Sequence, residues 1–247
     1  MTRKRLLFIL ALIIAANAAL VFFVYRQMRY AESDSNTYIA RWFNQPQGRA
    51  ALATDNFRPC PGAPFLLPSS GFVGLLYADP ARPYNGLNRH TGIDIFGDGP
   101  PGEVAIVAAY DGYLTRLPDW LSTVIIRHDD PLQPGRTIWT YYTHMASRDG
   151  SESYVSSAFP PGTEEVFVEQ GTLLGFQGEY NGSGPRIGLH VHMSIVESDA
   201  SGWFKNEARL GNTLDPSPYF GLPLHIDADP QRPIRCPDTD DAERTAR

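Results

Sequence analysis

A run of 20 residues without a single charge, LLFILALIIAANAALVFFVY (6–25), constrains this chain more than any other feature. Asn17 is its only strongly polar member. At a helical rise of about 1.5 Å per residue such a run reaches roughly 30 Å, which matches the hydrocarbon core of a bilayer. We therefore predict one transmembrane helix over residues 6–25, preceded by a short basic tail at 1–5.

The tail sets the orientation of this helix. Arg3, Lys4 and Arg5 stand directly before the apolar run, and such clusters stay in the cytoplasm. The rest of the chain is then expected outside the cytoplasmic membrane, on a single-pass anchor. A cleaved signal peptide is the alternative, because residues 16–18, Ala-Asn-Ala, resemble a cleavage site. The apolar run continues past that point as LVFFVY, which favours the uncleaved anchor.

Cysteine use is sparse and bears on the compartment. The chain has two cysteines, Cys60 and Cys236. Outside the cytoplasm such a pair can oxidise, and in the chain-entropy model closing so long a loop stabilises the fold by roughly 5 kcal/mol. We predict this disulfide, with two free thiols as the alternative. No CxxC occurs, which excludes a thiolate zinc site. The formal net charge of −6 gives no reason to expect nucleic acid as a partner.

The chain divides into segments of different composition. Residues 26–70 are polar with scattered aromatics and then rich in proline, as in a juxtamembrane stalk or packing segment; a short helix there would end at QPQG (45–48). Residues 71–200 hold short β-branched and aromatic runs separated by turn residues. We predict an all-β domain here, an antiparallel β-sandwich or open barrel. Residues 201–247 form a proline-rich extension whose charged end is expected to fray.

Histidines mark the chemistry of this domain. In GLHVHMSI (188–195), His190 and His192 project from one face if the run is extended. A half-buried strand with its polar face toward solvent is the alternative. In NRHTGIDIF, His90 and Asp94 share a strand face, and Gly92 adds no side chain between them. His90 and Asp94 can then reach one metal ion.

A third run, TIWTYYTHM, places Tyr142 and His144 on one strand face. Three separate strands thus present imidazole or carboxylate groups. A catalytic zinc ion takes three protein ligands with nitrogen and oxygen donors at about 2.0 to 2.2 Å, and keeps one position for water. The combination of the three runs points to such a site more strongly than any one of them.

The motifs HTGID, YTHM and HVH, in this order, resemble the signature of the lysostaphin and LytM type zinc endopeptidases, peptidase family M23, whose usual form is HxxxD, YxHL and HLH. The connecting runs EVAIVAAYDGYL and VEQGTLLGFQG are similar to the hairpin and late turn of this family. The resemblance covers roughly residues 86–197. Met replaces the usual Leu of YxHL, and Val stands within HVH; both are apolar exchanges of small cost.

The resemblance implies the role of each motif residue. His90, Asp94 and His192 become the Zn²⁺ ligands, and His144 and His190 become unligated catalytic imidazoles. Zinc lowers the pKa of a bound water to near 7 and polarises the scissile carbonyl. We assign His190 to the general base and His144 to transition-state stabilisation, although the two roles are interchangeable at this level.

Other residues near the motifs are less specific. Tyr142 is a candidate groove residue, with simple packing as the alternative. His128, in IIRHDD, is expected to be structural, and His225 lies in the proline-rich extension outside the family-like region. The connection at 146–165 is longer than the usual link of the family. It is either a groove wall that narrows substrate choice or an inert insertion.

These expectations combine into a function. The sequence predicts a membrane-anchored zinc metalloendopeptidase that hydrolyses stem peptides or cross-bridges of bacterial cell-wall peptidoglycan, in the periplasm or cell wall. The alternative is an inactive LytM-like domain that binds or activates another wall hydrolase, but all five motif positions are filled here. A β-domain that binds sugars through its aromatics would leave the histidine spacing unexplained.

Overall fold

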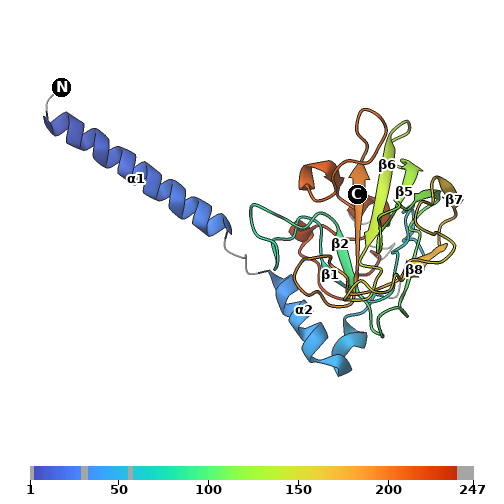
Figure 1. Cartoon of the computed structure of the whole chain (residues 1–247). Coiled ribbons are helices and arrows are strands. Elements are labelled where there is room, and N and C mark those ends of the chain that lie inside the picture. The colour runs from blue at the N-terminus through green and yellow to red at the C-terminus, as the bar shows by residue number, and fades with distance from the viewer. Residues whose placement is uncertain (1–2, 29–32, 55–57, 238–247) are drawn as a thin grey trace, which may run out of the picture.

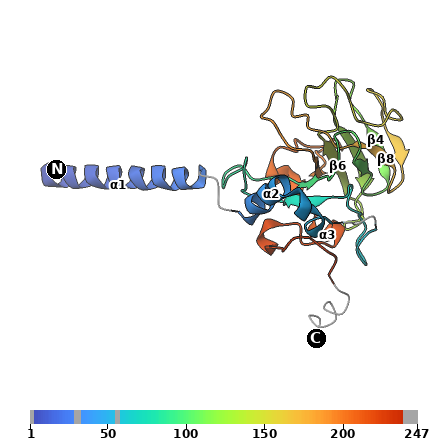
Figure 2. The same cartoon turned by 90° about the horizontal axis from the view of Figure 1, so that it is seen from below.

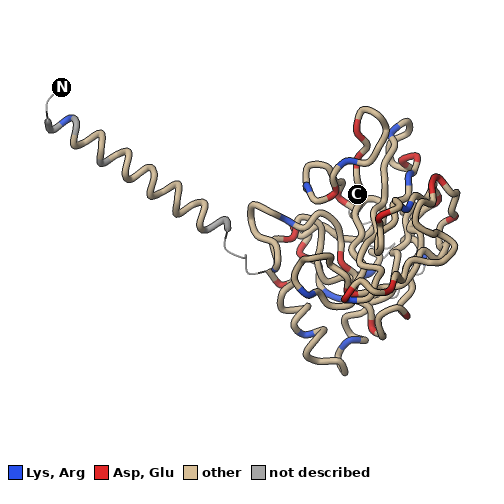
Figure 3. Tube along the Cα trace, viewed as in Figure 1, with Lys and Arg blue, Asp and Glu red and all other residues tan. Residues whose placement is uncertain are grey.

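The computed structural model describes residues 3–28, 33–54 and 58–237. Helix α1 (Arg3–Met28) contains the apolar run. Its segment Leu7–Tyr25 is long and apolar enough to cross a membrane and is not buried against the rest of the protein. Figure 3 shows the middle of α1 without charged residues. The helix confirms the expected local structure, whereas its insertion in a membrane stays a prediction.

The region that contains the three histidine motifs is an antiparallel β-structure (Figure 1). Seven strands follow the order β1-β2-β9-β6-β5-β4-β7, and β10 pairs with β9. A separate two-stranded sheet joins β3 and β8. The bounds are β1 (Phe72–Leu75), β2 (Ile93–Phe96), β3 (Ala105–Val107), β4 (Gly112–Thr115), β5 (Val124–Asp129), β6 (Thr137–Thr143), β7 (Val166–Val168), β8 (Leu173–Phe176), β9 (Val191–Glu197) and β10 (Thr213–Leu214). The predicted all-β class with one N-terminal apolar helix is confirmed.

Strand β9 lies at the centre of this sheet. It pairs with β2, β6 and β10, all antiparallel. Its Val191, Met193 and Ile195 belong to the main hydrophobic core. His192 and Ser194, which alternate with them, are also buried. Both faces of β9 are therefore covered, and in the described part of the chain two polar atoms of this face, His192 Nε2 and Ser194 Oγ, are buried without a hydrogen-bond partner.

The segment at 33–54 folds onto the sheet. Helix α2 (Asp34–Asn44) is capped by Ser33 and ends directly before Gln45-Pro46, as QPQG predicts. A 3₁₀ turn, η1 (Pro46–Ala51), follows it. The ring of Trp42 stacks on Phe72 of β1 with a centroid separation of 5.4 Å. Figures 1 and 2 both show α2 lying against the β-domain. Residues 33–54 are therefore a packing segment and not a free stalk.

The C-terminal extension also returns to the sheet. It contains η2 (Leu210–Asn212), α3 (Ser217–Phe220) and η3 (Ile226–Ala228). Arg232 donates through Nε to the carbonyl oxygen of Val73 at 2.7 Å. The structure contains the predicted disulfide between Cys60 and Cys236. The domain limits at 71 and 200 stay predictions, and the charged end at 238–247 lies outside the described residues.

The long connection at 146–165 is held in place by one buried guanidinium. Arg116 donates to the carbonyl oxygens of Phe159 at 2.9 Å and Leu121 at 3.0 Å, and to Oγ of Ser153 at 3.0 Å. Only 4% of Arg116 is exposed. Because a buried guanidinium is costly without acceptors, this network fixes the connection against β4.

Candidate active site

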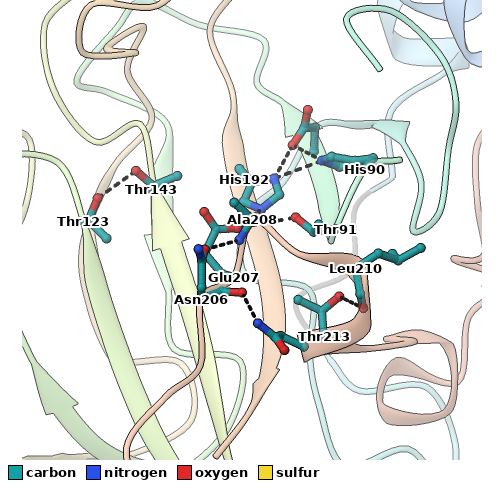
Figure 4. Close-up of polar contacts among 12 residues, drawn as sticks. His90, Thr91, Thr123, Thr143, His192, Asn206, Glu207, Ala208, Leu210 and Thr213 are labelled. Carbon is teal, nitrogen blue, oxygen red and sulfur yellow. Dashed lines mark hydrogen bonds and ion pairs between the residues drawn. The ribbon is translucent and has the colours of Figure 1, made fainter. Parts of the chain in front are cut away.

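Three side chains converge on one point between β2 and β9. His90 Nε2 lies 3.0 Å from Asp94 Oδ1 and 3.0 Å from His192 Nδ1, and His192 Nδ1 lies 2.9 Å from Asp94 Oδ1. Asp94 and His192 are direct partners in the antiparallel register. All three residues are buried. Figure 4 shows His90 and His192 directed at each other.

His90 reaches this point from a loop and not from a strand. β2 begins at Ile93, so the predicted strand face shared by His90 and Asp94 was wrong. A Cβ at Gly92 would lie 2.1 Å from the carbonyl oxygen of Met193. Glycine is therefore required for the chain to approach β9 closely, and this approach brings His90 beside His192.

The tautomer of His90 is set by its second nitrogen. His90 Nδ1 lies 2.9 Å from the carbonyl oxygen of Leu76, which only accepts, so Nδ1 carries the proton and donates. Nε2 then carries no proton, and its lone pair, which could bind a metal ion, faces Asp94. The ring of Tyr84 packs over His90 with a centroid separation of 4.9 Å. His90 is thus fixed with one lone pair directed into the cluster.

The carboxylate of Glu207 faces Nε2 of His192, a contact that the sequence did not indicate. This Nε2 lies 3.7 Å from Glu207 Oε2, too far for a hydrogen bond, and is buried without a partner within hydrogen-bond distance in the described part of the chain. Thr91 Oγ1 donates to the same Glu207 oxygen at 3.4 Å, as Figure 4 shows. Glu207 lies in a loop beyond the family-like region, and no local motif marks it.

The charges of this cluster favour a cation. Burial raises the pKa of Asp94, but the neighbouring imidazoles of His90 and His190 outweigh burial and hold it well below its usual range. Burial lowers the pKa of His192, but Asp94 and Glu207 outweigh it and raise the value to about 10. Two carboxylates thus draw positive charge to His192.

The donor set fits zinc. Two imidazole nitrogens and one carboxylate oxygen lie within 4.8 Å of one another, and this is a common set of three protein ligands at a catalytic zinc site. Glu207 stands where the outer N–H of a metal-bound His192 would face a carboxylate, as metal-ligating histidines usually require. His90, Asp94 and His192 are therefore the residues that could hold the ion.

Two further imidazoles lie beside this cluster. The rings of His144 and His190 are 4.5 Å apart between centroids. Nδ1 of His144 lies 2.7 Å from the carbonyl oxygen of Tyr180, and Nδ1 of His190 lies 2.8 Å from that of Gly188. Both Nδ1 atoms must donate, which leaves each Nε2 as an acceptor. His190 Nε2 lies 3.7 Å from Asp94 Oδ2.

Burial keeps these two imidazoles uncharged. It lowers the pKa of His190. It also lowers the pKa of His144, to about 3, with a smaller contribution from the neighbouring His190 and His192. At neutral pH both rings are therefore neutral, and each Nε2 carries a lone pair.

The backbone at His144 corrects one prediction. β6 ends at Thr143, and His144 has a left-handed φ of 75°, which interrupts the alternation of side chains. Tyr142 consequently does not share a face with His144. Tyr142 is buried in the core, where its hydroxyl accepts a hydrogen bond from the amide of Ala109 at 3.0 Å. Tyr141 lines the groove instead.

A groove of about 810 Å³ is lined by Asp94 and His192 of the cluster and by both further imidazoles. Aromatic rings of Tyr84, Tyr141 and Tyr180 line it, as do Ile39 and Phe43 of α2. No residue of the long connection at 146–165 is among the described residues that line it. Of the two interpretations of that connection, the structure favours an insertion away from the groove.

The remaining two histidines lie elsewhere. His128 Nδ1 lies 2.7 Å from the carbonyl oxygen of Asp111, and its Nε2 lies 2.8 Å from Thr140 Oγ1. Nδ1 of His225 accepts from the amide of Asp227 at the start of η3. Neither lines the groove.

Comparison with known proteins gives structural matches only. No protein-family model matches the sequence, and no curated protein matches it. Lysostaphin from Staphylococcus simulans matches with 17% identity and a TM-score of 0.35, over 53% of this chain and 43% of that chain. A protein described as an M23 peptidase from Pseudomonas aeruginosa matches with 20% identity and a TM-score of 0.34, over 66% of this chain and 55% of that chain.

A zinc-containing peptidase from Vibrio cholerae matches with 14% identity and a TM-score of 0.32, over 64% of this chain and 36% of that chain. The three matches are described as lysostaphin, an M23 peptidase and a zinc-containing peptidase. This chain covers less than two thirds of each of these three chains, and the identities and TM-scores are too low to transfer an activity, a substrate or a metal from them.

Proposed function

We propose that this chain is a membrane-anchored zinc metalloendopeptidase of the lysostaphin and M23 type that hydrolyses peptide bonds of bacterial peptidoglycan. One observation carries the proposal. His90, Asp94 and His192 surround one point, and His144 and His190 stand beside it in the same groove, each with an unprotonated Nε2. This arrangement supplies three ligands and two bases.

The metal-binding half uses three residues. When bound, zinc supplies a nucleophilic water at neutral pH and polarises the scissile carbonyl. His90 Nε2, Asp94 Oδ1 and His192 Nδ1 would hold the ion. Leu76 fixes the tautomer of His90 through its carbonyl oxygen, and Glu207 faces the outer nitrogen of His192. These outer contacts orient the ligand atoms before any metal arrives.

The proton-transfer half uses His144 and His190. We assign His190 to the general base, because its Nε2 is 3.7 Å from Asp94 Oδ2 and is thus beside the ligands. His144 begins as an acceptor, since its Nδ1–H is held by Tyr180. His190 would pass the proton that it takes from the water to the leaving amine, and His144, once protonated at Nε2 from solvent, would stabilise the oxyanion.

The cellular setting follows from three features of the chain. Helix α1 is long and apolar enough to span a membrane, and basic residues precede the apolar run. The disulfide between Cys60 and Cys236 is typical of an oxidising compartment. We infer a single-pass anchor with the catalytic domain in the periplasm or cell wall.

The test uses the purified full chain with zinc and isolated peptidoglycan fragments. New amine termini identified by mass spectrometry are expected from the natural chain and not from His144→Ala, which keeps all three metal ligands. If the zinc-loaded chain releases no new amine termini, the enzyme proposal fails. Stimulation of a second wall hydrolase by that inactive chain would then support the alternative of an activator domain.

A further inference from the structure

Helix α2 is fixed to the catalytic domain at its C-terminal end. Trp42 stacks on Phe72 at 5.4 Å, and the ring of Phe43 meets Phe96 edge-on at 5.6 Å. Only 1% of Trp42 is exposed. Burial of an aromatic side chain of this size is strongly stabilising, so this end of α2 is a stable part of the domain.

The N-terminal end of α2 is tied to the metal cluster. Ser33 Oγ donates to Asp79 Oδ1 at 3.0 Å, and Ser35 Oγ donates to Asp79 Oδ2 at 2.5 Å. Asp79 is fully buried. The carbonyl oxygen of Asp79 accepts from the amide of His90 at 3.0 Å. The residue that caps α2 is therefore connected to a candidate metal ligand through a single buried aspartate.

Between these ends, α2 forms part of the groove. Ile39 and Phe43 line it together with His190. Phe43 packs so closely on the 188 position that a Cβ added to Gly188 would lie 2.3 Å from its ring. Gly188 also supplies the carbonyl that holds the Nδ1 proton of His190. Separating α2 from the β-domain would therefore remove part of the wall of the groove.

The chain between the apolar helix and α2 is short. Helix α1 ends at Met28, and Ser33 caps α2. Five residue steps span at most about 18 Å even when fully extended. Phe43 lies ten residues along α2, which adds roughly 15 Å at the rise of an α-helix. If α1 is the membrane anchor, the α2 wall of the groove lies within roughly 35 Å of its outer end.

We propose that the groove acts on peptides held at the membrane surface: uncross-linked stem peptides still joined to a lipid carrier. This inference rests on the proposed function and its anchor. A lipid-linked peptide begins at the bilayer surface. The rigid junction between α2 and the groove, together with the short connection before it, keeps the α2 wall of the groove within reach of such a substrate.

The test uses the full chain in phospholipid vesicles and a synthetic stem pentapeptide in three forms. One form is free, one is joined to a lipid by two prolines, and one by thirty prolines, a semi-rigid spacer of about 90 Å. A matched variant carries 24 Gly/Ser residues between Arg29 and Tyr30, which adds up to about 85 Å of reach. Cleavage rates of all three forms are measured for both proteins.

We expect the natural chain to cleave the short-spacer peptide about tenfold or more faster than the long-spacer peptide, because effective concentration depends on reach. The insertion should reduce this difference to less than about threefold and leave the rate on free peptide unchanged. Equal rates of the natural chain on both spacers, or no cleavage of the short-spacer form while the free peptide is cleaved, would overturn the inference and leave the enzyme proposal intact. No cleavage of any form would overturn both.

Discussion

Two buried histidine regions of the same sheet use their ring nitrogens differently. On β5, both nitrogens of His128 are hydrogen-bonded inside the protein, to the Asp111 carbonyl and to Thr140. At the groove, Nδ1 of His144 and Nδ1 of His190 each donate to a backbone carbonyl oxygen, and neither Nε2 has a hydrogen bond among the described residues. Burial alone is common to both regions. A ring nitrogen that lacks a hydrogen bond, such as Nε2 of His144 and His190, remains available to a ligand or a proton, whereas both nitrogens of His128 are already occupied.

The backbone around each region reflects the same difference. A Cβ at Gly112 would lie 2.6 Å from His128 Nδ1, so a glycine on β4 makes room for a ring that is enclosed by the sheet. His144 instead stands just past the end of β6 with a φ of 75°. A non-glycine residue in this region is uncommon and, at a candidate site, indicates that the ring is held in a required direction.

The largest expected effect separates the metal ligands from all other histidines. His192→Ala removes one of three ligands and should abolish metal retention. Loss of several kcal/mol of transition-state stabilisation lowers kcat/KM by roughly ten-thousandfold. Zinc content and peptidase rate on the same sample check this prediction. A variant that keeps both would show that the cluster is not the metal site.

The next effect separates the ligands from the free imidazoles. His144→Ala should lower kcat by about a hundredfold or more, while zinc content stays near that of the natural chain. Zinc analysis together with steady-state kinetics measures both. Loss of zinc in this variant would make His144 a ligand and would undo the division into two roles.

A smaller effect is expected at Glu207, which contacts the cluster through His192. Glu207→Gln removes the carboxylate that faces His192 and should weaken metal affinity or activity by about 10- to 100-fold. Glu197→Gln is the matched control, because Glu197 pairs with Lys205 at 2.7 Å and does not line the groove. Competition with a chelator gives both affinities. Equal affinities for the two variants would show that Glu207 does not position His192.

The smallest effect on activity is expected at His128. His128→Gln should leave kcat of the folded protein unchanged and lower the free energy of unfolding by about 1–3 kcal/mol, because buried partners lose their hydrogen bonds. Denaturant unfolding and kinetics on one preparation test this. A large loss of kcat would contradict the structural role.

The same residue carries a pH dependence with a definite sign. Burial lowers the pKa of His128 to about 4, whereas the unfolded value is near 6.5. Between pH 6.5 and pH 4, His128 is protonated in the unfolded chain but not in the folded protein. The contribution of His128 to the free energy of unfolding is therefore fully present above pH 6.5 and falls by roughly 1 kcal/mol per pH unit toward pH 4. His128→Gln should lose this contribution. An unchanged slope between pH 6.5 and 4 would assign it to other groups.

The sequence predicted what local pattern controls. Turn-separated β-branched runs predicted the antiparallel strands, QPQG predicted the end of α2, and an even cysteine pair outside the cytoplasm predicted the disulfide between Cys60 and Cys236. The ligand and base assignments came from the motif resemblance, and the contacts of these side chains support them without testing them.

Other features depended on segments distant in the sequence. Strict alternation predicted that Tyr142 and His144 share a strand face, but the left-handed residue at His144 ends the alternation. Tyr142, for which groove and packing roles were both open, is packed in the core, and Tyr141 lines the groove. Glu207 and the α2 wall with Phe43 approach the site only through tertiary packing. No periodicity or spacing within either segment encodes such a contact.

The central claim is that one divalent ion is held by residues from the loop before β2, from β2 itself and from β9. Anomalous diffraction at the zinc edge from crystals of the zinc-loaded protein tests it most directly. The account predicts one ion bonded to His90 Nε2, Asp94 Oδ1 and His192 Nδ1, with His144 and His190 outside bonding distance. An ion bound elsewhere, or no ion at these three residues, would contradict it.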